Sequence, residues 1–283
     1  MRIANGNGRL KLLIDDGAVD VEEASAGQFV ADPQAAYDRF AELQTWADSV
    51  SGPTEAFDRA TAGPPAPAPR QVFGIGLNYR DHAAESGVKA PDIPLVFTKY
   101  PSSFSGPVSQ VELPDGSVDW EVEVVAVIGR TAHRVPVEQA WSYVAGLTVG
   151  QDLSERVLQR SGPAPQYGLA KSYPGFSPMG PALVTPDAID RPDDLELGCE
   201  VNGVTMQHGR SADMIFPIPE LVSYLSGIVT LYPGDVIYTG TPPGVGMGRT
   251  PPVFLQPGDH LHSYVTGLGE LDQHLVATAP TDG

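Results

Sequence analysis

Glycine and proline interrupt this chain along its whole length. The 283 residues include 31 glycines and 28 prolines, and these follow no repeat period. Because both residues favour turns and end helices and strands, they limit the chain to short elements joined by many turns. The apolar runs between the turns are rich in β-branched side chains, which is typical of strands. We therefore predict a β-rich α+β fold, a mixed or antiparallel β-sandwich or roll and not a doubly wound sheet.

A proline-rich connector over residues 62–69 predicts a boundary between a small N-terminal β/α cap (1–66) and a large domain (67–283). In the cap, we expect a β unit over residues 1–30 and a helix over residues 33–50, where apolar side chains recur at helical spacing. In the large domain, we expect a helix over residues 219–227 and strands over residues 72–76, 94–99, 118–128, 147–152, 195–202, 235–239 and 260–265.

The charge balance excludes two classes of partner. The chain has 35 acidic and 17 basic residues, which gives a formal net charge of -18. Nucleic acids and anionic membranes both require basic clusters, so we expect neither as a partner. A single cysteine, Cys199, rules out an intramolecular disulfide, and its place in an apolar run predicts a buried, unreactive thiol. With no apolar N-terminal region and no long apolar span visible, we expect a soluble cytoplasmic protein.

Two glutamates in an apolar run give the strongest local signal of chemistry. Glu121 and Glu123 lie in the segment DWEVEVVAVIG. Residues two apart in a strand share a face, so both carboxylates lie on the face of Val125 and Val127. Two carboxylates on a partly apolar face repel each other and resist desolvation, and a hard divalent cation would compensate both effects. The alternative is an edge strand whose glutamates are in water.

Further polar residues follow the next predicted strand. Asp152 at its end would complete a site of three carboxylates; alternatively, Asp152 or Ser154 would cap a helix through residues 155–158. Arg156 and Lys171 would bind an anionic substrate or stabilise an oxyanion, although Arg156 could simply balance Glu155.

Two other segments carry candidate functional groups. His82 and Glu85 are three residues apart, so they lie on one face of a helical turn, where a carboxylate raises the basicity of an imidazole. Their alternative is an ordinary surface pair. The loop YTGTPPGVG presents backbone N–H groups and the Thr241 hydroxyl, which together would hold a carboxylate. The same loop lacks the features of a nucleotide-binding loop.

In this order, the motifs resemble those of the fumarylacetoacetate hydrolase family. The resemblance covers about residues 70–270 and rests on the segments GIGLNYRDHAAESG, PLVFTKYPSSFSGP, DWEVEVVAVIG, GLTVGQDLSERVLQ, GLAKSYPGFSPMGP, VNGVTMQHGRSADMIFPIPELVSYLS and LYPGDVIYTGTPPGVG. It implies the family's mixed β-sandwich roll behind a variable cap, usually in a homodimer.

The resemblance also implies roles for individual residues. One Mg2+ or Mn2+ ion per subunit would be held by Glu121, Glu123 and Asp152. A lid dyad would consist of His82 and Glu85, and substrate or transition-state contacts would come from Arg156, Gln159, Lys171 and Thr241, with Lys171 in a catalytic role.

The implied reaction is metal-dependent cleavage of a C–C bond in a small anionic 2,4-dioxo acid, such as an acylpyruvate or a fumarylpyruvate-like compound. The metal would chelate the substrate, the His-Glu dyad would activate water, and the leaving carbanion would become an enolate. The same enolate would permit an oxaloacetate-like decarboxylase, a dienoate isomerase or a dehydratase in aromatic or sugar-acid catabolism. A non-catalytic metal-binding or carboxylate-binding module is a further alternative.

Overall fold

Two sheets dominate the structure, a computed structural model that describes residues 1–15, 17–52, 54–81 and 89–278. Within these ranges the larger sheet has 12 strands. Its main path runs β4 (Glu55–Ala56), β3 (Gly17–Asp20), β2 (Arg9–Ile14), β1 (Arg2–Gly6), β14 (Ser177–Val184), β12 (Val144–Gln151), β11 (Val122–Ile128), β17 (Val236–Tyr238), β6 (Val72–Gly76) and β7 (Leu95–Thr98). Beside this path, β5 (Ala62–Gly63) pairs with β1, and β8 (Phe104–Ser105) pairs with β14.

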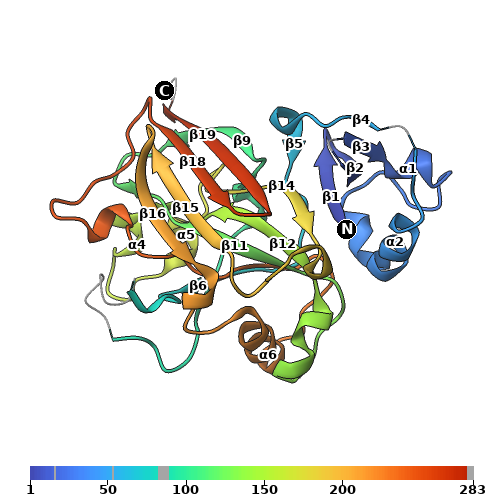
Figure 1. Cartoon of the computed structure of the whole chain (residues 1–283). Coiled ribbons are helices and arrows are strands. Elements are labelled where there is room, and N and C mark those ends of the chain that lie inside the picture. Colours follow the sequence, from blue (N-terminus) through green and yellow to red (C-terminus); the bar gives the residue numbers. More distant parts are fainter. Residues whose placement is uncertain (16, 53, 82–88, 279–283) are drawn as a thin grey trace.

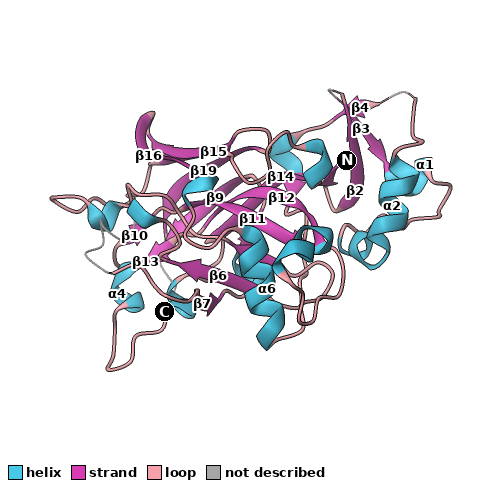
Figure 2. Ribbon diagram, turned by 60° about the horizontal axis from the view of Figure 1, so that its bottom comes forward, coloured by secondary structure: helices cyan, strands magenta, loops and turns pink. Residues whose placement is uncertain are grey.

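The second sheet packs across the large one (Figures 1 and 2). Its order is β16 (Val204–Arg210), β15 (Glu196–Val201), β18 (His260–Val265), β19 (Gly269–Ala277) and β9 (Val108–Leu113). A short separate pair joins β10 (Val118–Asp119) to β13 (Ser154–Glu155). Sheets packed over a shared core confirm the predicted β-rich sandwich roll.

Helices are short and lie around the sheets. The α-helices are α1 (Val21–Ala24), α2 (Phe40–Ala47), α4 (Arg156–Gln159), α5 (Tyr167–Ala170) and α6 (Ile218–Ile228). The 3-10 helices are η1 (Gln34–Arg39), η2 (Arg59–Thr61), η3 (Pro101–Ser103), η4 (Val137–Tyr143), η5 (Pro186–Ala188), η6 (Ser211–Asp213) and η7 (Gly246–Gly248). The helix predicted over residues 219–227 is α6, whereas the one predicted over 33–50 is divided into η1 and α2. None of the helices in the described ranges is long and apolar enough to cross a bilayer.

Strand β11 supplies apolar side chains to two cores. Val122 and Val124 join the core between the two sheets, together with the buried Cys199 of β15. Val125 and Val127 point to the other side and pack with residues of the N-terminal region. This alternation is the one that the sequence predicts, and it leaves both faces of β11 buried.

The N-terminal β unit continues the large sheet. Strand β1 pairs antiparallel with β14, with Ile3 opposite Leu183 and Ala4 opposite Ala182. Leu43 of α2 packs into the same core as Val125 and Val127 of β11. The cap thus shares a sheet and a core with the rest of the chain (Figure 1), and the boundary at residues 66 and 67 stays a prediction.

Candidate active site

Antiparallel pairing of β11 and β12 brings three carboxylates together. In this register, Glu123 lies opposite Gly150, so that Glu121 and Asp152 meet just beyond the paired residues. The carboxylate oxygens of Glu121, Glu123 and Asp152 lie within 4.8 Å of one another. The three residues are only 7%, 1% and 0% exposed. The edge-strand alternative for the two glutamates is therefore wrong, because β11 lies between β12 and β17.

The residue that caps the following helix is Glu155, and neither Asp152 nor Ser154 has that role. Glu155 accepts hydrogen bonds from the backbone N–H groups of Val157 (2.9 Å) and Leu158 (2.6 Å) at the start of α4. A glutamate here satisfies two of the helix's unpaired N–H groups, which leaves the Asp152 carboxylate available to the site.

The surroundings of Glu123 oppose the ionisation of its carboxyl group. Burial raises the pKa of its carboxyl well above the ordinary value, and the charges of Asp152 and Glu121 raise it further. The backbone N–H of Gly240 donates a 2.7 Å hydrogen bond to Glu123 Oε2 and stabilises the ionised form only in part. The loop predicted to hold a carboxylate thus contacts one that belongs to the protein itself.

Two buried lysines approach the carboxylates. Lys171 Nζ donates to Glu121 Oε2 (2.7 Å), Asp152 Oδ2 (2.6 Å) and Ser154 Oγ (2.7 Å). Burial lowers the pKa of the Lys171 ammonium, but the charges of Asp152 and Glu121 outweigh burial and leave that pKa raised. Lys99, fully buried, contacts the other oxygen of Asp152 and the backbone carbonyl of Lys171.

Lys99 was not predicted as a site residue. The signal was present, since a lysine directly follows the apolar strand LVFT in a strongly acidic chain. A buried ammonium requires a buried carboxylate nearby, but the sequence alone does not say which one.

Arg156 and Gln159, the first and last residues of α4, form a second polar group. The Arg156 guanidinium donates to Glu121 Oε1 (2.7 Å), to Asp119 Oδ2 (2.8 Å) and to Gln159 Oε1 (3.0 Å). Arg156 is therefore paired with Asp119 and Glu121, and its proposed role of balancing Glu155 is wrong. Asp119 also accepts hydrogen bonds from the backbone of η7, so one carboxylate fixes two walls of the site.

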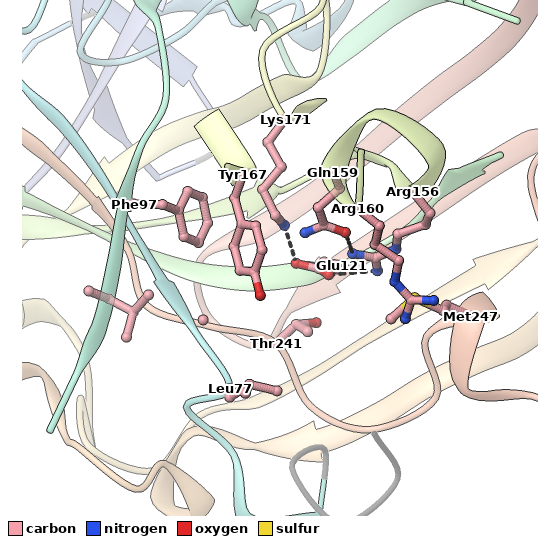
Figure 3. Close-up of a pocket in the computed structure, with 12 residues that line it drawn as sticks. Leu77, Phe97, Glu121, Arg156, Gln159, Arg160, Tyr167, Lys171, Thr241 and Met247 are labelled. Atoms are coloured by element: carbon pink, nitrogen blue, oxygen red, sulfur yellow. Dashed lines mark hydrogen bonds and ion pairs between the residues drawn. The ribbon is translucent and has the colours of Figure 1, made fainter. Parts of the chain in front are cut away.

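A cavity of about 150 Å3 opens beside these groups (Figure 3). Of the predicted site residues, it is lined by Glu121, Arg156, Gln159, Lys171 and Thr241. The Thr241 hydroxyl donates to the Val122 carbonyl at 2.9 Å, which ties this wall to β11.

The remaining lining residues were not predicted. They are Ile75, Gly76, Leu77, Phe97, Arg160, Tyr167 and Met247. No sequence motif predicts that these residues belong to the site, because they come close to one another only in the folded chain. The predicted dyad, His82 and Glu85, lies outside the described residues.

The donor set fits a hard divalent cation. Three buried carboxylates offer oxygen ligands of the kind that Mg2+ and Mn2+ prefer. Asp119 is paired with Arg156, so Lys99 and Lys171 are left to compensate two of the three negative charges. Burial raises the pKa of Glu123 first, the neighbouring carboxylates Asp152 and Glu121 raise it further, and a bound cation would favour the ionised form against both effects.

Comparison with known proteins identifies the family. The sequence model described as fumarylacetoacetate (FAA) hydrolase C-terminal matches residues 71–276. The chain belongs to the fumarylacetoacetate hydrolase family. Among curated relatives of this family member, the mitochondrial oxaloacetate tautomerase Fahd2a of Rattus norvegicus is 44% identical over 215 residues, which cover 75% of this chain and 68% of the relative.

Solved structures of the family share the whole fold. A Mycobacterium smegmatis protein, provisionally assigned as HpcE, is 55% identical with a TM-score of 0.96, and the match covers 99% of this chain and 100% of that one. Maleylpyruvate hydrolase from Sphingobium sp. SYK-6, solved with manganese(II) and pyruvate, is 26% identical with a TM-score of 0.81 over 99% and 100% of the two chains. These enzymes confirm the predicted fold and family. Proteins similar to this chain are named as hydrolases, isomerases and oxaloacetate tautomerases, and the maleylpyruvate hydrolase was solved with manganese(II).

Proposed function

We propose that this protein is a metal-dependent hydrolase that cleaves a C–C bond in a 2,4-dioxo acid of the acylpyruvate or fumarylpyruvate type. One observation carries the proposal: a small cavity is lined by Glu121 of the buried three-carboxylate cluster and by the side chains of Lys171, Arg156 and Gln159. The likeness to maleylpyruvate hydrolase supports the same reaction class.

In this reaction, water adds to the 4-oxo carbon and the bond between C3 and C4 breaks. Its electron pair remains on C3 as the enolate of pyruvate, and a proton then returns to C3, which gives pyruvate and a carboxylate. Glu121, Glu123 and Asp152 would hold Mg2+ or Mn2+, which supplies a Lewis acid for the oxo groups when bound.

Lys171 would stabilise negative charge and would not act as a base. Its pKa is raised by Asp152 and Glu121 once burial is overcome, so it stays protonated at neutral pH. Gln159 has its amide oxygen occupied by Arg156, which leaves its NH2 group to donate toward substrate (Figure 3). We propose that His82, with Glu85, takes the proton from the attacking water.

A tautomerase or decarboxylase acting on oxaloacetate is the second candidate. The specific support is the 44% identity to an oxaloacetate tautomerase. That chemistry moves a proton or releases CO2 and needs no attack by water, so a His82→Ala variant would keep substantial turnover. Dienoate isomerase and dehydratase reactions share this expectation, whereas a binding module would show no turnover.

The deciding experiment compares acetylpyruvate and oxaloacetate as substrates of metal-reconstituted protein, with and without chelator, and identifies the products. Metal-dependent formation of pyruvate and acetate supports the hydrolase. Conversion of oxaloacetate alone supports the second candidate, and turnover in chelator without metal contradicts both.

A variant series connects activity to the carboxylates. Glu121→Ala should lose metal binding in calorimetry and reduce turnover by more than about 100-fold, because changes even around metal ligands cost about 10–100-fold. Glu112→Ala, at an exposed position of β9, is the matched control and should change neither. We also propose that the protein is a cytoplasmic homodimer that binds a small anionic substrate. Light scattering would measure the mass of the assembly in solution.

A further inference from the structure

Arg160 stands at the mouth of the cavity and has no anionic partner among the residues that the structure describes. It follows α4 directly, is exposed to solvent and lines the cavity. Its guanidinium donates a 2.7 Å hydrogen bond to the thioether sulfur of Met247. A thioether is a weak acceptor, so this contact leaves most of the hydrogen-bonding capacity of the guanidinium unused.

The other cations of this pocket are all neutralised. Arg156 pairs with Asp119 and Glu121, and Lys171 pairs with Glu121 and Asp152. Among the residues that the structure describes, no carboxylate lies within salt-bridge distance of Arg160. In a chain with net charge -18, an unpaired guanidinium beside a buried acidic cluster is available to an external anion.

The position of Arg160 follows from the helix that carries Arg156. Arg160 is the C-cap of α4, four residues after Arg156, so the helix places it about one turn beyond Arg156. Glu155 fixes the start of this helix through hydrogen bonds to Val157 and Leu158. Arg156 therefore lies in the interior beside the carboxylate cluster, and Arg160 lies one turn farther out.

The opposite wall is aromatic. Phe97 and Tyr167 contact each other edge to face, with ring centroids 5.8 Å apart. Figure 3 shows these two rings on one side of the cavity and Arg160 with Met247 on the other. A flat substrate tail that leaves the carboxylate cluster would pass between the rings and the guanidinium.

We infer that Arg160 is a specificity-determining residue that binds a second carboxylate, at the far end of the substrate tail. The substrate class is thus a 2-oxo acid with two carboxylates, and an acylpyruvate with an uncharged tail would be a poorer substrate. The inference rests on the proposed function for its reaction, but its binding step holds for any 2-oxo acid that enters this site.

The test uses two acylpyruvates that differ in one group: one tail ends in a carboxylate, the other in the isosteric carboxamide. Wild type should prefer the carboxylate. Arg160→Met should lower kcat/KM for the carboxylate substrate by about 10- to 100-fold, mainly through KM, because a hydrogen-bonded charge pair contributes on this scale. The carboxamide substrate should be nearly unaffected, and Arg160→Lys should restore part of the loss.

Arg191→Met is the matched control, since Arg191 is an exposed arginine that pairs with Asp194 outside the cavity lining. A second arm measures binding by calorimetry on metal-loaded protein, with a saturated 2-oxo acid that ends in a carboxylate and one that ends in a methyl group. This arm does not depend on cleavage.

The two arms separate the two hypotheses. If no acylpyruvate is cleaved but Arg160→Met selectively weakens binding of the dicarboxylate, the proposed reaction fails and the role of Arg160 stands. If wild type binds both 2-oxo acids equally, or if Arg160→Met weakens both to the same degree, the role of Arg160 is refuted whatever the reaction.

Discussion

Replacing Glu123 by glutamine should stabilise the metal-free protein while it removes metal binding. Glu123 is 1% exposed, and its carboxylate lies within 4.8 Å of those of Glu121 and Asp152. At that distance and an effective dielectric constant of about 20, each neighbouring charge repels it by about 3–4 kcal/mol. Lys171 and Lys99 offset part of this repulsion.

We expect the net gain of Glu123→Gln to be about 1–3 kcal/mol in free energy of unfolding, after this offset. The glutamine oxygen can still accept the hydrogen bond from Gly240, and its NH2 group can donate to the remaining carboxylates. Urea denaturation in the presence of chelator measures the gain. Glu112→Gln, the same change on the exposed side of β9, is the control and should have almost no effect.

The gain should depend on pH with a defined sign. Because the folded-state pKa of Glu123 is raised, the folded wild type binds a proton more readily than the unfolded chain does. Wild-type stability is therefore lost as pH rises from about 4.3, the pKa of an unperturbed glutamate, through the raised value. The advantage of the variant should vanish near pH 4 and increase toward neutrality. A well-folded Glu123→Gln variant that is no more stable than wild type at pH 8, in chelator, would refute the reasoning.

Two further predictions concern the stability of the fold. A Cβ added at Gly150 would lie 2.4 Å from Val125 Cγ2, so Gly150→Ala should lower the free energy of unfolding by about 1–3 kcal/mol. A Cβ added at Gly227 of α6 would have no neighbour within 4 Å, so Gly227→Ala should leave the free energy of unfolding equal or higher. Thermal unfolding of both variants checks this prediction. Hydrogen bonds from Arg9 hold the pKa of Asp20 below its ordinary value, so this contribution should be lost as pH falls below about 4. Acid titration of wild type against Asp20→Asn should show a shallower loss in the variant, and parallel curves would contradict the prediction.

Much of the fold around the site could be predicted because strand periodicity is local. The alternation over residues 121–128 requires nothing beyond neighbouring side chains, and it correctly placed Glu121 and Glu123 on one face. The strands β6 and β18 were predicted with their observed bounds for the same reason, because their pattern depends only on residues that are close in sequence. Here the pattern of apolar residues alone determines which positions are buried.

The rest depends on contacts between distant segments. Lys99 reaches Asp152 across 53 residues, and Gly240 reaches Glu123 across 117. No local pattern specifies such pairs, so the buried lysine was missed, as was the aromatic wall opposite Arg160. The capping residue of α4 was predicted wrongly for another reason. Asp152, Ser154 and Glu155 all have side chains that can accept hydrogen bonds from the first N–H groups of a helix, and the backbone conformation determines which of them does so.

The separation of these segments also constrains when the metal centre can exist during folding. Glu123 needs β11 to pair with β12, and its Gly240 contact needs β17 to pair with β11, over a sequence separation that makes loop closure slow. An unfolded chain holds only the adjacent pair Glu121 and Glu123, and the third carboxylate, Asp152, joins them when β12 pairs with β11. We therefore expect a divalent cation to bind after folding, when β12 has brought Asp152 beside the two glutamates, so that the ion would not serve as a template for the fold.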